Sequence, residues 1–411
     1  MSWSTDAPSA PPQQATIWPL RSILVPLGVA YLAVDARGRL AYALPRLVRD
    51  IEEWSAWDLK YRHNEVIQWF SGSPVYGVVD GAVYPPASHA ILWPLLGWLD
   101  FGAARVFWAV TTMLAAGVLA LLLWRLTRRE TTWQRLFVAG LAFAGYPLQH
   151  ALFLGQIGVH TAALAAVGAF LVFNRERSWS LDALGGILLA CSLVKPTLSL
   201  PLVLAALIAA GRARPALITG AAYLALSLVA AAAQPAGLFA LLRDWLAVGS
   251  GRVPLLTGVP NVHLYLARSG ATSALMPVSL SLLAVAALCI WKWRSADPWL
   301  LVGAAAIFTR FWAHSMRYDD AFLLLAVLAL VRSAHVLDGT ARKLSGWLLL
   351  AAWVTLLTPG WAFFDLAPPY VRAIDGLQAT LWLGVMIFLG LAARQHAAAV
   401  RSAGPDTVAA P

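Results

Sequence analysis

A charged stretch near the start of the chain has residue types and spacing that suit acid–base chemistry. Asp58, Arg62 and Glu65 are spaced i, i+4 and i+7, so a helix would present all three on one face. A carboxylate held beside a membrane could serve as a general base. The same residues, with tryptophans nearby in sequence, would equally suit an interfacial helix with an Asp–Arg ion pair. The residues alone leave both interpretations open.

Two further polar residues interrupt apolar stretches later in the chain. Gln156 lies in the glycine-flanked stretch 155–158, which is typical of a turn or a helix cap. Its side chain could also bind a sugar hydroxyl or a phosphate oxygen. Lys195 directly precedes Pro196, which predicts an ammonium group at an abrupt helix break. Such a lysine could bind an anionic ligand, or it could simply extend to the membrane surface.

The stretch 309–320 is the densest polar group outside the first polar loop, which runs from Asp35 to Tyr84. Arg310 and Arg317 could hold a phosphate through charge-assisted hydrogen bonds. Asp319 and Asp320 could orient these arginines or bind a sugar, although a salt-bridged turn would explain the same residues. The other candidate binding residues are His314 in this stretch, Tyr84 near the end of the first polar loop, and Asn261 and His263 in another polar loop.

The composition predicts an all-α, polytopic membrane protein. Hydrophobic residues make up 60% of the 411 residues, charged residues only 12%, and the mean hydropathy is +0.69. Apolar runs recur along the whole length, which predicts about 12 spans. The expected spans are 17–34, 103–124, 136–152, 157–173, 180–195, 197–210, 214–233, 272–291, 298–312, 319–333, 343–358 and 376–394.

The basic residues predict the orientation, because they recur after every second expected span and such loops face the cytoplasm. This alternation requires that 85–99 does not cross the membrane, so we expect an interfacial or half-embedded helix there. The first outer loop is then 35–102, with interfacial helices, inside a membrane domain at 17–395. The tails 1–16 and 396–411 are expected to be disordered and cytoplasmic.

Several kinds of chemistry lack their sequence signals. The chain has no Gly-rich phosphate loop, no His-Glu-x-x-His, no Gly-x-Ser-x-Gly and no metal-ligand spacing of cysteine and histidine. The two cysteines, Cys191 and Cys289, both lie in apolar runs, so we expect neither a disulfide framework nor a cysteine metal site. Cytoplasmic arginines account for much of the net charge of +10, so no nucleic acid is needed as a partner to explain it. No cofactor is expected.

Short motifs follow one another in a recognisable order. They are Asp58, then Gly72-Ser73-Pro74-Val75-Tyr76-Gly77, Tyr84-Pro85-Pro86, Pro94, Gly155-Gln156 and Lys195-Pro196. This order resembles glycosyltransferase family 87, which consists of integral-membrane enzymes of the GT-C type, and the resemblance covers about residues 17–395. The stretch 258–265 departs from the polar pattern of the family, so the acceptor is not identified.

The resemblance implies inverting transfer of a hexose, with mannose as the expected sugar, from a polyprenyl-phosphate donor to an acceptor hydroxyl. The reaction would take place at the outer face of a bacterial cytoplasmic membrane. Asp58 matches the catalytic aspartate of the family's first loop and would act as general base. Lys195, Arg310 or Arg317 would stabilise the departing lipid phosphate, and no metal would be needed.

Two other functions remain possible on the sequence. A transporter or lipid flippase would carry polar residues near the middle of its spans and a symmetric pair of broken helices. Here the polar residues collect on one predicted face and no internal repeat is evident, which favours the enzyme. A non-catalytic assembly subunit would tolerate the loss of Asp58.

Overall fold

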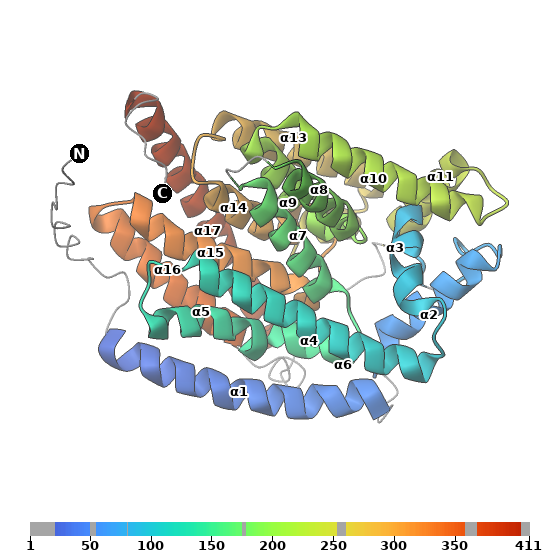
Figure 1. Ribbon diagram of the computed structural model, residues 1–411, viewed down its shortest axis with the longest axis horizontal. Coiled ribbons are helices and arrows are strands. Elements are labelled where there is room, and N and C mark those ends of the chain that lie inside the picture. Colours follow the sequence, from blue (N-terminus) through green and yellow to red (C-terminus); the bar gives the residue numbers. More distant parts are fainter. Residues whose placement is uncertain are drawn as a thin grey trace, which may run out of the picture.

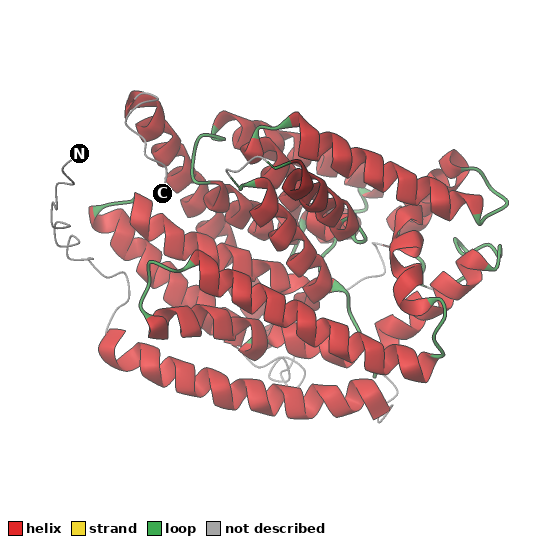
Figure 2. Cartoon of the chain, in the orientation of Figure 1, coloured by secondary structure: helices red, strands yellow, loops and turns green. Residues whose placement is uncertain are grey.

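The computed structural model describes residues 21–49, 55–79, 81–174, 178–252, 260–357 and 368–403. In this part of the chain 83% of the residues are helical, and none is in a strand (Figure 2). The prediction of an all-α protein is therefore confirmed.

Most of the helices run along the long axis of the molecule, whereas α2, α3 and α11 gather at one end of it, on the right in Figure 1. In chain order the elements are α1 (Arg21–Arg49), α2 (Trp57–Phe70), α3 (Pro86–Leu96), α4 (Phe101–Leu126), α5 (Thr132–Ala144), α6 (Tyr146–Leu154), α7 (Gly158–Val172), α8 (Trp179–Ser192), α9 (Pro196–Ala210), α10 (Ala213–Ala232), α11 (Leu238–Arg252), α12 (Val262–Arg268), the 3-10 helix η2 (Thr272–Ala274), α13 (Leu275–Lys292), α14 (Pro298–Trp312), the 3-10 helix η3 (Arg317–Phe322), α15 (Leu323–Val336), α16 (Gly339–Leu357) and α17 (Pro368–Ala403).

Five stretches of the described residues are long and apolar enough to cross a membrane. They are Phe101–Leu126, Thr132–Leu154, Ala213–Ala232, Thr272–Lys292 and Tyr370–Ser402. The predicted number of about 12 spans is not confirmed. Each predicted apolar segment that the structure describes contains helix. However, α7, α8, α9 and α14 have only 14 or 15 residues, fewer than the roughly 20 that are needed to cross a bilayer.

Short helices pack closely in the centre of the molecule. Helix α15 is buried along nearly its whole length, against α14, α16 and α17. At Gly303 of α14, an added Cβ would lie 2.2 Å from the Cβ of Ala329 of α15. The glycine therefore lets the two helices approach closely, as small residues do in membrane bundles.

The first helix extends beyond its predicted end. The charge of Asp35 predicted an end to the apolar segment, but α1 continues to Arg49. Asp35 accepts from Arg39 Nε at 2.5 Å, and the other guanidinium nitrogens of Arg39 donate to Gln149 Oε1 at 2.8 Å and to the Leu357 carbonyl at 2.9 Å. Because these polar groups are paired, the helix passes through Asp35 without leaving a charge unsatisfied.

The segment after α1 contains the two short helices that the sequence predicts for the first outer loop. Helix α3 has 11 residues, or about 16 Å of helix, which is too short to cross a bilayer. Its Ser88 Oγ donates to the Val194 carbonyl at 2.7 Å, and Trp69 of α2 donates through Nε1 to the Ala230 carbonyl at 2.8 Å. These bonds fix α2 and α3 to the ends of α8 and α10.

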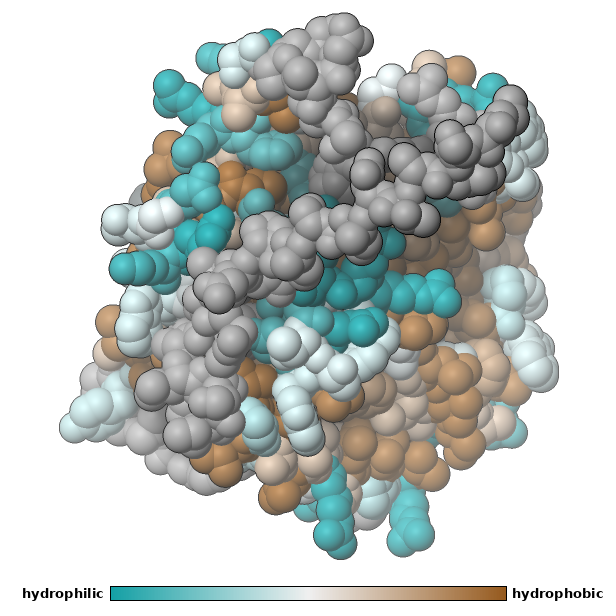
Figure 3. All heavy atoms as spheres, turned by 60° about the vertical axis from the view of Figure 1, so that its left-hand side comes forward, coloured by the Kyte–Doolittle hydropathy of each residue, from teal (hydrophilic) through white to brown (hydrophobic). Residues whose placement is uncertain are grey.

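The other end of the molecule, on the left in Figure 1, carries basic turns. Arg128 and Arg129 follow α4, Lys292 ends α13, Arg294 lies in the turn after α13, and Arg342 lies in the first turn of α16. Figure 3 brings this end forward and shows hydrophilic side chains gathered on it between hydrophobic surfaces. The basic turns and helices α2 and α3 therefore lie at opposite ends.

Candidate active site

Helix α2 carries Asp58 in its first turn and docks on the turn between α6 and α7. The backbone N–H of Ala56 donates to the Phe153 carbonyl at 2.9 Å. Gly155 adopts the left-handed conformation (φ 71°), and an added Cβ there would lie 2.4 Å from the Cβ of Leu59. Only glycine permits both this conformation and this close approach. The contact brings the first turn of α2 against the residue that follows Gly155.

That residue is Gln156, whose side chain is bonded to Asp58. Gln156 Nε2 donates to Asp58 Oδ2 at 2.5 Å. Burial raises the pKa of Asp58 above its ordinary value of 3.8, although the Gln156 hydrogen bond and the positive charges of Arg62 and Lys195 oppose the rise. With its pKa raised, the carboxylate is a stronger base than an exposed aspartate.

Lys195 lies directly before α9, at the predicted helix break, with Pro196 at the first helical position. Its Nζ donates to Asp319 Oδ1 at 2.7 Å, and it lies 5.2 Å from the centre of the Tyr318 ring. The second carboxylate oxygen of Asp319 accepts from the backbone N–H of Met316 at 3.0 Å. The ammonium group of Lys195 is thus held in place by Asp319 of η3.

Arg62 holds the segment between α2 and α3. It donates to Glu65 Oε2 at 2.5 Å and to the Gly81 carbonyl at 2.7 Å, and its guanidinium lies 4.2 Å from the centre of the Tyr84 ring. The hydroxyl of Tyr76 donates to the Tyr84 carbonyl at 2.7 Å. The ion pair on α2 therefore joins Arg62 to Glu65. The contact between the Arg62 guanidinium and the Tyr84 ring places this ring beside the charged residues.

These residues form one group at the α2 and α3 end. Arg62, Lys195 and Asp319 all lie close enough for their charges to act on Asp58. The same three charges and that of Asp58 act on the Tyr84 hydroxyl. We define the Asp58 cluster as Asp58, Arg62, Tyr84, Gln156, Lys195 and Asp319. It combines a basic carboxylate with an ammonium group, which are the two charges needed to take up a proton and to stabilise an anion.

Arg310 forms a second, separate network. Its guanidinium pairs with Asp320, which also accepts from the Tyr146 hydroxyl, and Arg310 Nη2 donates to Gln378 Oε1 at 3.4 Å. Arg310 is 1% exposed and Asp320 is 2% exposed. In this conformation the pair joins α14 to η3, α6 and α17 and offers no open position to a phosphate. A phosphate-binding role for Arg310 stays a prediction.

Arg317 is engaged by a different carboxylate. Its Nε and Nη2 donate to Asp375 Oδ1 at 3.1 and 2.6 Å. His314, in the turn before η3, lies near the Asp58 cluster, because the charges of Asp319 and Lys195 act on its ring. Burial lowers the pKa of His314 to about 4, so this imidazole is neutral at physiological pH.

The polar residues around α12 hold its position. Asn261 caps the helix by accepting from the Leu264 N–H through Oδ1 at 2.9 Å. His263 accepts from the His314 backbone N–H through Nδ1 at 3.2 Å, and its Nε2 lies 2.6 Å from Ser279 Oγ. These bonds attach α12 to the turn that carries His314.

Tyr318 is a neighbour of the cluster that the sequence did not indicate as a candidate. Its ring faces Lys195 Nζ, but an aromatic between Arg317 and Asp319 resembles an ordinary interfacial tyrosine. Among the described residues, no group of three or more His, Cys, Asp or Glu side chains is placed to share a metal ion.

The comparison with protein-family models finds the model of glycosyltransferase family 87, which matches residues 82–315, more than half of the chain. The chain belongs to glycosyltransferase family 87. The family assignment made from the order of the motifs is confirmed. No curated protein matches the chain, and no solved structure matches it. Family 87 membership and the apolar helices identify a membrane glycosyltransferase.

The matched region contains Tyr84, Gln156 and Lys195 but neither Asp58 nor Asp319. The fold joins the two sets, because Asp58 is bonded to Gln156 and Asp319 to Lys195. The Asp58 cluster therefore combines residues inside the matched region with residues outside it.

Replacing Gly155 by alanine should lower both stability and transfer. A left-handed alanine costs roughly 1–2 kcal/mol, and the new Cβ must also push Leu59 and α2 away. The matched control is Gly211→Ala, because Gly211 has a similar φ of 63° but no atom within 4 Å of an added Cβ. Thermal unfolding and transfer are measured for both variants. We expect both to be destabilised and only Gly155→Ala to lose activity; equal activities would show that the docking of α2 does not position the site.

Proposed function

We propose that this protein transfers a hexose, with mannose as the expected sugar, from a polyprenyl-phosphate donor to an acceptor hydroxyl. The observation that carries the proposal is the Asp58 cluster, in which a carboxylate oriented by Gln156 lies in the field of a lysine held by Asp319. The acceptor could be a lipid, a glycan or a protein.

In the proposed reaction, Asp58 accepts the proton of the acceptor hydroxyl as its oxygen attacks the anomeric carbon of the sugar. The bond from that carbon to the phosphate oxygen breaks on the opposite face, and its electron pair remains with the phosphate. The configuration at the anomeric carbon is therefore inverted. Asp58 Oδ1 has no hydrogen-bond partner in the described part of the chain, so we assign it to the acceptor hydroxyl.

Lys195 would stabilise the negative charge that develops on the departing phosphate. Its Nζ is fixed by Asp319 before the reaction, so little reorganisation is needed when the charge appears. His314 is neutral beside it and would contribute hydrogen bonding rather than charge.

An apolar groove supports a lipid-linked donor. A cavity of about 550 Å³ between α16 and α17 is lined by Trp347, Leu350, Leu377 and Leu381, and its polar lining residues are Thr355 and Gln378. Gln378 accepts a hydrogen bond from Arg310, whose partner Asp320 directly follows Asp319 in sequence. The apolar lining of this cavity suits a hydrocarbon chain such as that of a polyprenyl phosphate.

The charge distribution supports a site on the outer face of the cytoplasmic membrane. The basic turns lie at the end of the molecule opposite α2 and α3 (Figure 1). Basic turns face the cytoplasm in membrane proteins, so the Asp58 cluster would face outward.

The test is a comparison of donors with purified protein in detergent. Radiolabelled mannose is supplied as polyprenyl-phosphate mannose or as a nucleotide sugar, with a membrane lipid extract as acceptor. We expect transfer from the polyprenyl donor only, with the opposite anomeric configuration in the product. Transfer from the nucleotide sugar, or retention of configuration, would contradict the proposal.

Replacing Gln156 by leucine should move the acidic limb of the pH profile to higher pH. The Gln156 hydrogen bond lowers the pKa of Asp58, so its loss raises that pKa further. Asp58 acts only when deprotonated; hence the variant loses activity at a pH where the wild type is still active. The measurement is kcat/KM against pH. Gln134→Leu is the control, because Gln134 caps α5 far from the cluster. An unchanged limb in Gln156→Leu would show that Asp58 does not govern the profile.

A further inference from the structure

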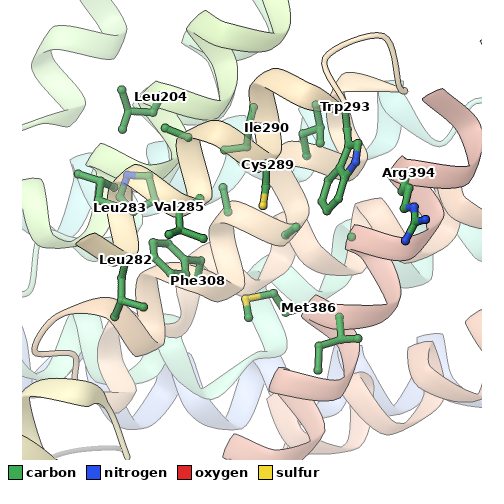
Figure 4. A pocket seen from close by; sticks show the side chains of 18 of the residues that line it. Leu204, Leu282, Leu283, Val285, Cys289, Ile290, Trp293, Phe308, Met386 and Arg394 are labelled. Carbon is green, nitrogen blue, oxygen red and sulfur yellow. The ribbon is translucent and has the colours of Figure 1, made fainter. Parts of the chain in front are cut away.

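A second apolar groove opens between α13, α14 and α17, with a contribution from α9. Its volume is about 410 Å³, within the roughly 300–1,000 Å³ of ligand-binding cavities. Figure 4 shows side chains of these helices facing it, among them Leu283, Phe308 and Met386. Of the described residues that line it, Arg394 alone is charged.

The groove ends at a cationic rim. Arg394 lies at one end of it, beside Trp293 (Figure 4). Arg401 Nη1 donates to the Lys292 carbonyl at 3.3 Å, so the C-terminal parts of α13 and α17 lie side by side. Lys292 and Arg294 are exposed next to Trp293. A tryptophan beside basic side chains is typical of the depth at which lipid headgroups lie.

The positive charge of Arg394 is not neutralised by the described protein. Its guanidinium is exposed and has no ion pair with any described residue. Asp297, an acidic residue at this end, already accepts from Arg332 Nη2 through Oδ2 at 2.6 Å. An apolar groove that ends at an open guanidinium matches a molecule with a long hydrocarbon chain and an anionic head.

We propose that this groove binds a phospholipid with an anionic headgroup, with an acyl chain between α13 and α17 and the phosphate at Arg394. The site is distinct from the Asp58 cluster, because the basic rim and helix α2 lie at opposite ends of the molecule. A transmembrane helix of a second copy would fill the apolar groove but would leave Arg394 without an anion. The lipid satisfies both parts of the site, and the proposal does not depend on the reaction that the enzyme catalyses.

The experiment is native mass spectrometry of the full chain after incubation with defined lipid, supplied as phosphatidylglycerol or as phosphatidylcholine with the same acyl chains. Arg394→Gln removes the charge and leaves the groove. Gly390→Leu fills the groove and leaves the charge, and there is room for the change, because an added Cβ would lie 3.7 Å from the Trp293 ring. The matched control is Arg125→Gln, an exposed arginine at the same end of the molecule that does not line the groove.

We expect the wild type and Arg125→Gln to retain phosphatidylglycerol in preference to phosphatidylcholine. Arg394→Gln should weaken retention of phosphatidylglycerol by about fivefold, the effect of one basic residue on an anionic lipid, without changing phosphatidylcholine. Gly390→Leu should lower retention of both lipids. Equal retention of the two lipids by the wild type would overturn the proposal, and so would an Arg394→Gln that behaves like Arg125→Gln. A lipid-free dimer that Gly390→Leu dissociates would show that a second copy occupies the groove.

Discussion

Asp58→Asn should reduce sugar transfer by about 10²–10⁴-fold, the range that a general base contributes. The change keeps the size of the side chain and an oxygen that can accept from Gln156 Nε2, so the docking of α2 is preserved. It replaces the carboxylate that we assign to the acceptor proton by an amide, which cannot take up that proton. The measurement is single-turnover transfer from polyprenyl-phosphate mannose, which separates the chemical step from lipid exchange.

The control for this variant is Asp338→Asn. Asp338 is exposed in the turn before α16 and pairs with Arg342 at 2.7 Å, at the basic end of the molecule. We expect this variant to transfer at the wild-type rate. Asp58→Glu should recover part of the activity, because a carboxylate is restored but displaced by one methylene. An Asp58→Asn protein that is folded and fully active would exclude Asp58 as the base.

Hydropathy was sufficient to predict the helical class, because a bilayer accepts only segments whose backbone bonds are satisfied internally. It was not sufficient to count the spans. Helix α15 is apolar because it is buried among other helices, and a buried helix and a lipid-facing helix have the same composition. The end of α1 could not be predicted either, since Asp35 is tolerated only through Arg39 and the distant carbonyl of Leu357.

The sequence placed some residues of the candidate site at one end of the molecule but did not predict the bonds between them. Topology placed Asp58, Gln156 and Lys195 at the same end, and the structure brings them together. The bonds from Gln156 to Asp58 and from Lys195 to Asp319 join residues 98 and 124 positions apart, a separation over which local spacing carries no information.

Local spacing was also ambiguous where it did apply. Residues i+3 and i+4 are both neighbours on a helix, and Arg62 pairs with Glu65 rather than with Asp58. Asp58 is consequently available to bond with Gln156, and this bond depends on the close approach of Gly155 to Leu59 of α2.

Lys195→Met should lower both the rate of transfer and the stability of the fold. We expect a loss of about 10²–10³ in rate, because the departing phosphate loses its counter-charge. The partner Asp319 is 3% exposed, and a buried carboxylate without its cation costs about 3–5 kcal/mol of stability. The two effects have different causes, so they can be separated by a second substitution.

The double variant Lys195→Met/Asp319→Asn provides this separation, because it removes both charges of the pair. We expect it to recover much of the lost stability in thermal unfolding while transfer stays low. Arg332→Met is the control, since Arg332 forms a comparable ion pair with the buried Asp297 at the basic end and should lose stability but not the rate per folded molecule. If the double variant regained transfer along with stability, Lys195 would serve only to hold η3 through Asp319. If transfer stays low after the fold is restored, the ammonium group itself acts on the reacting phosphate.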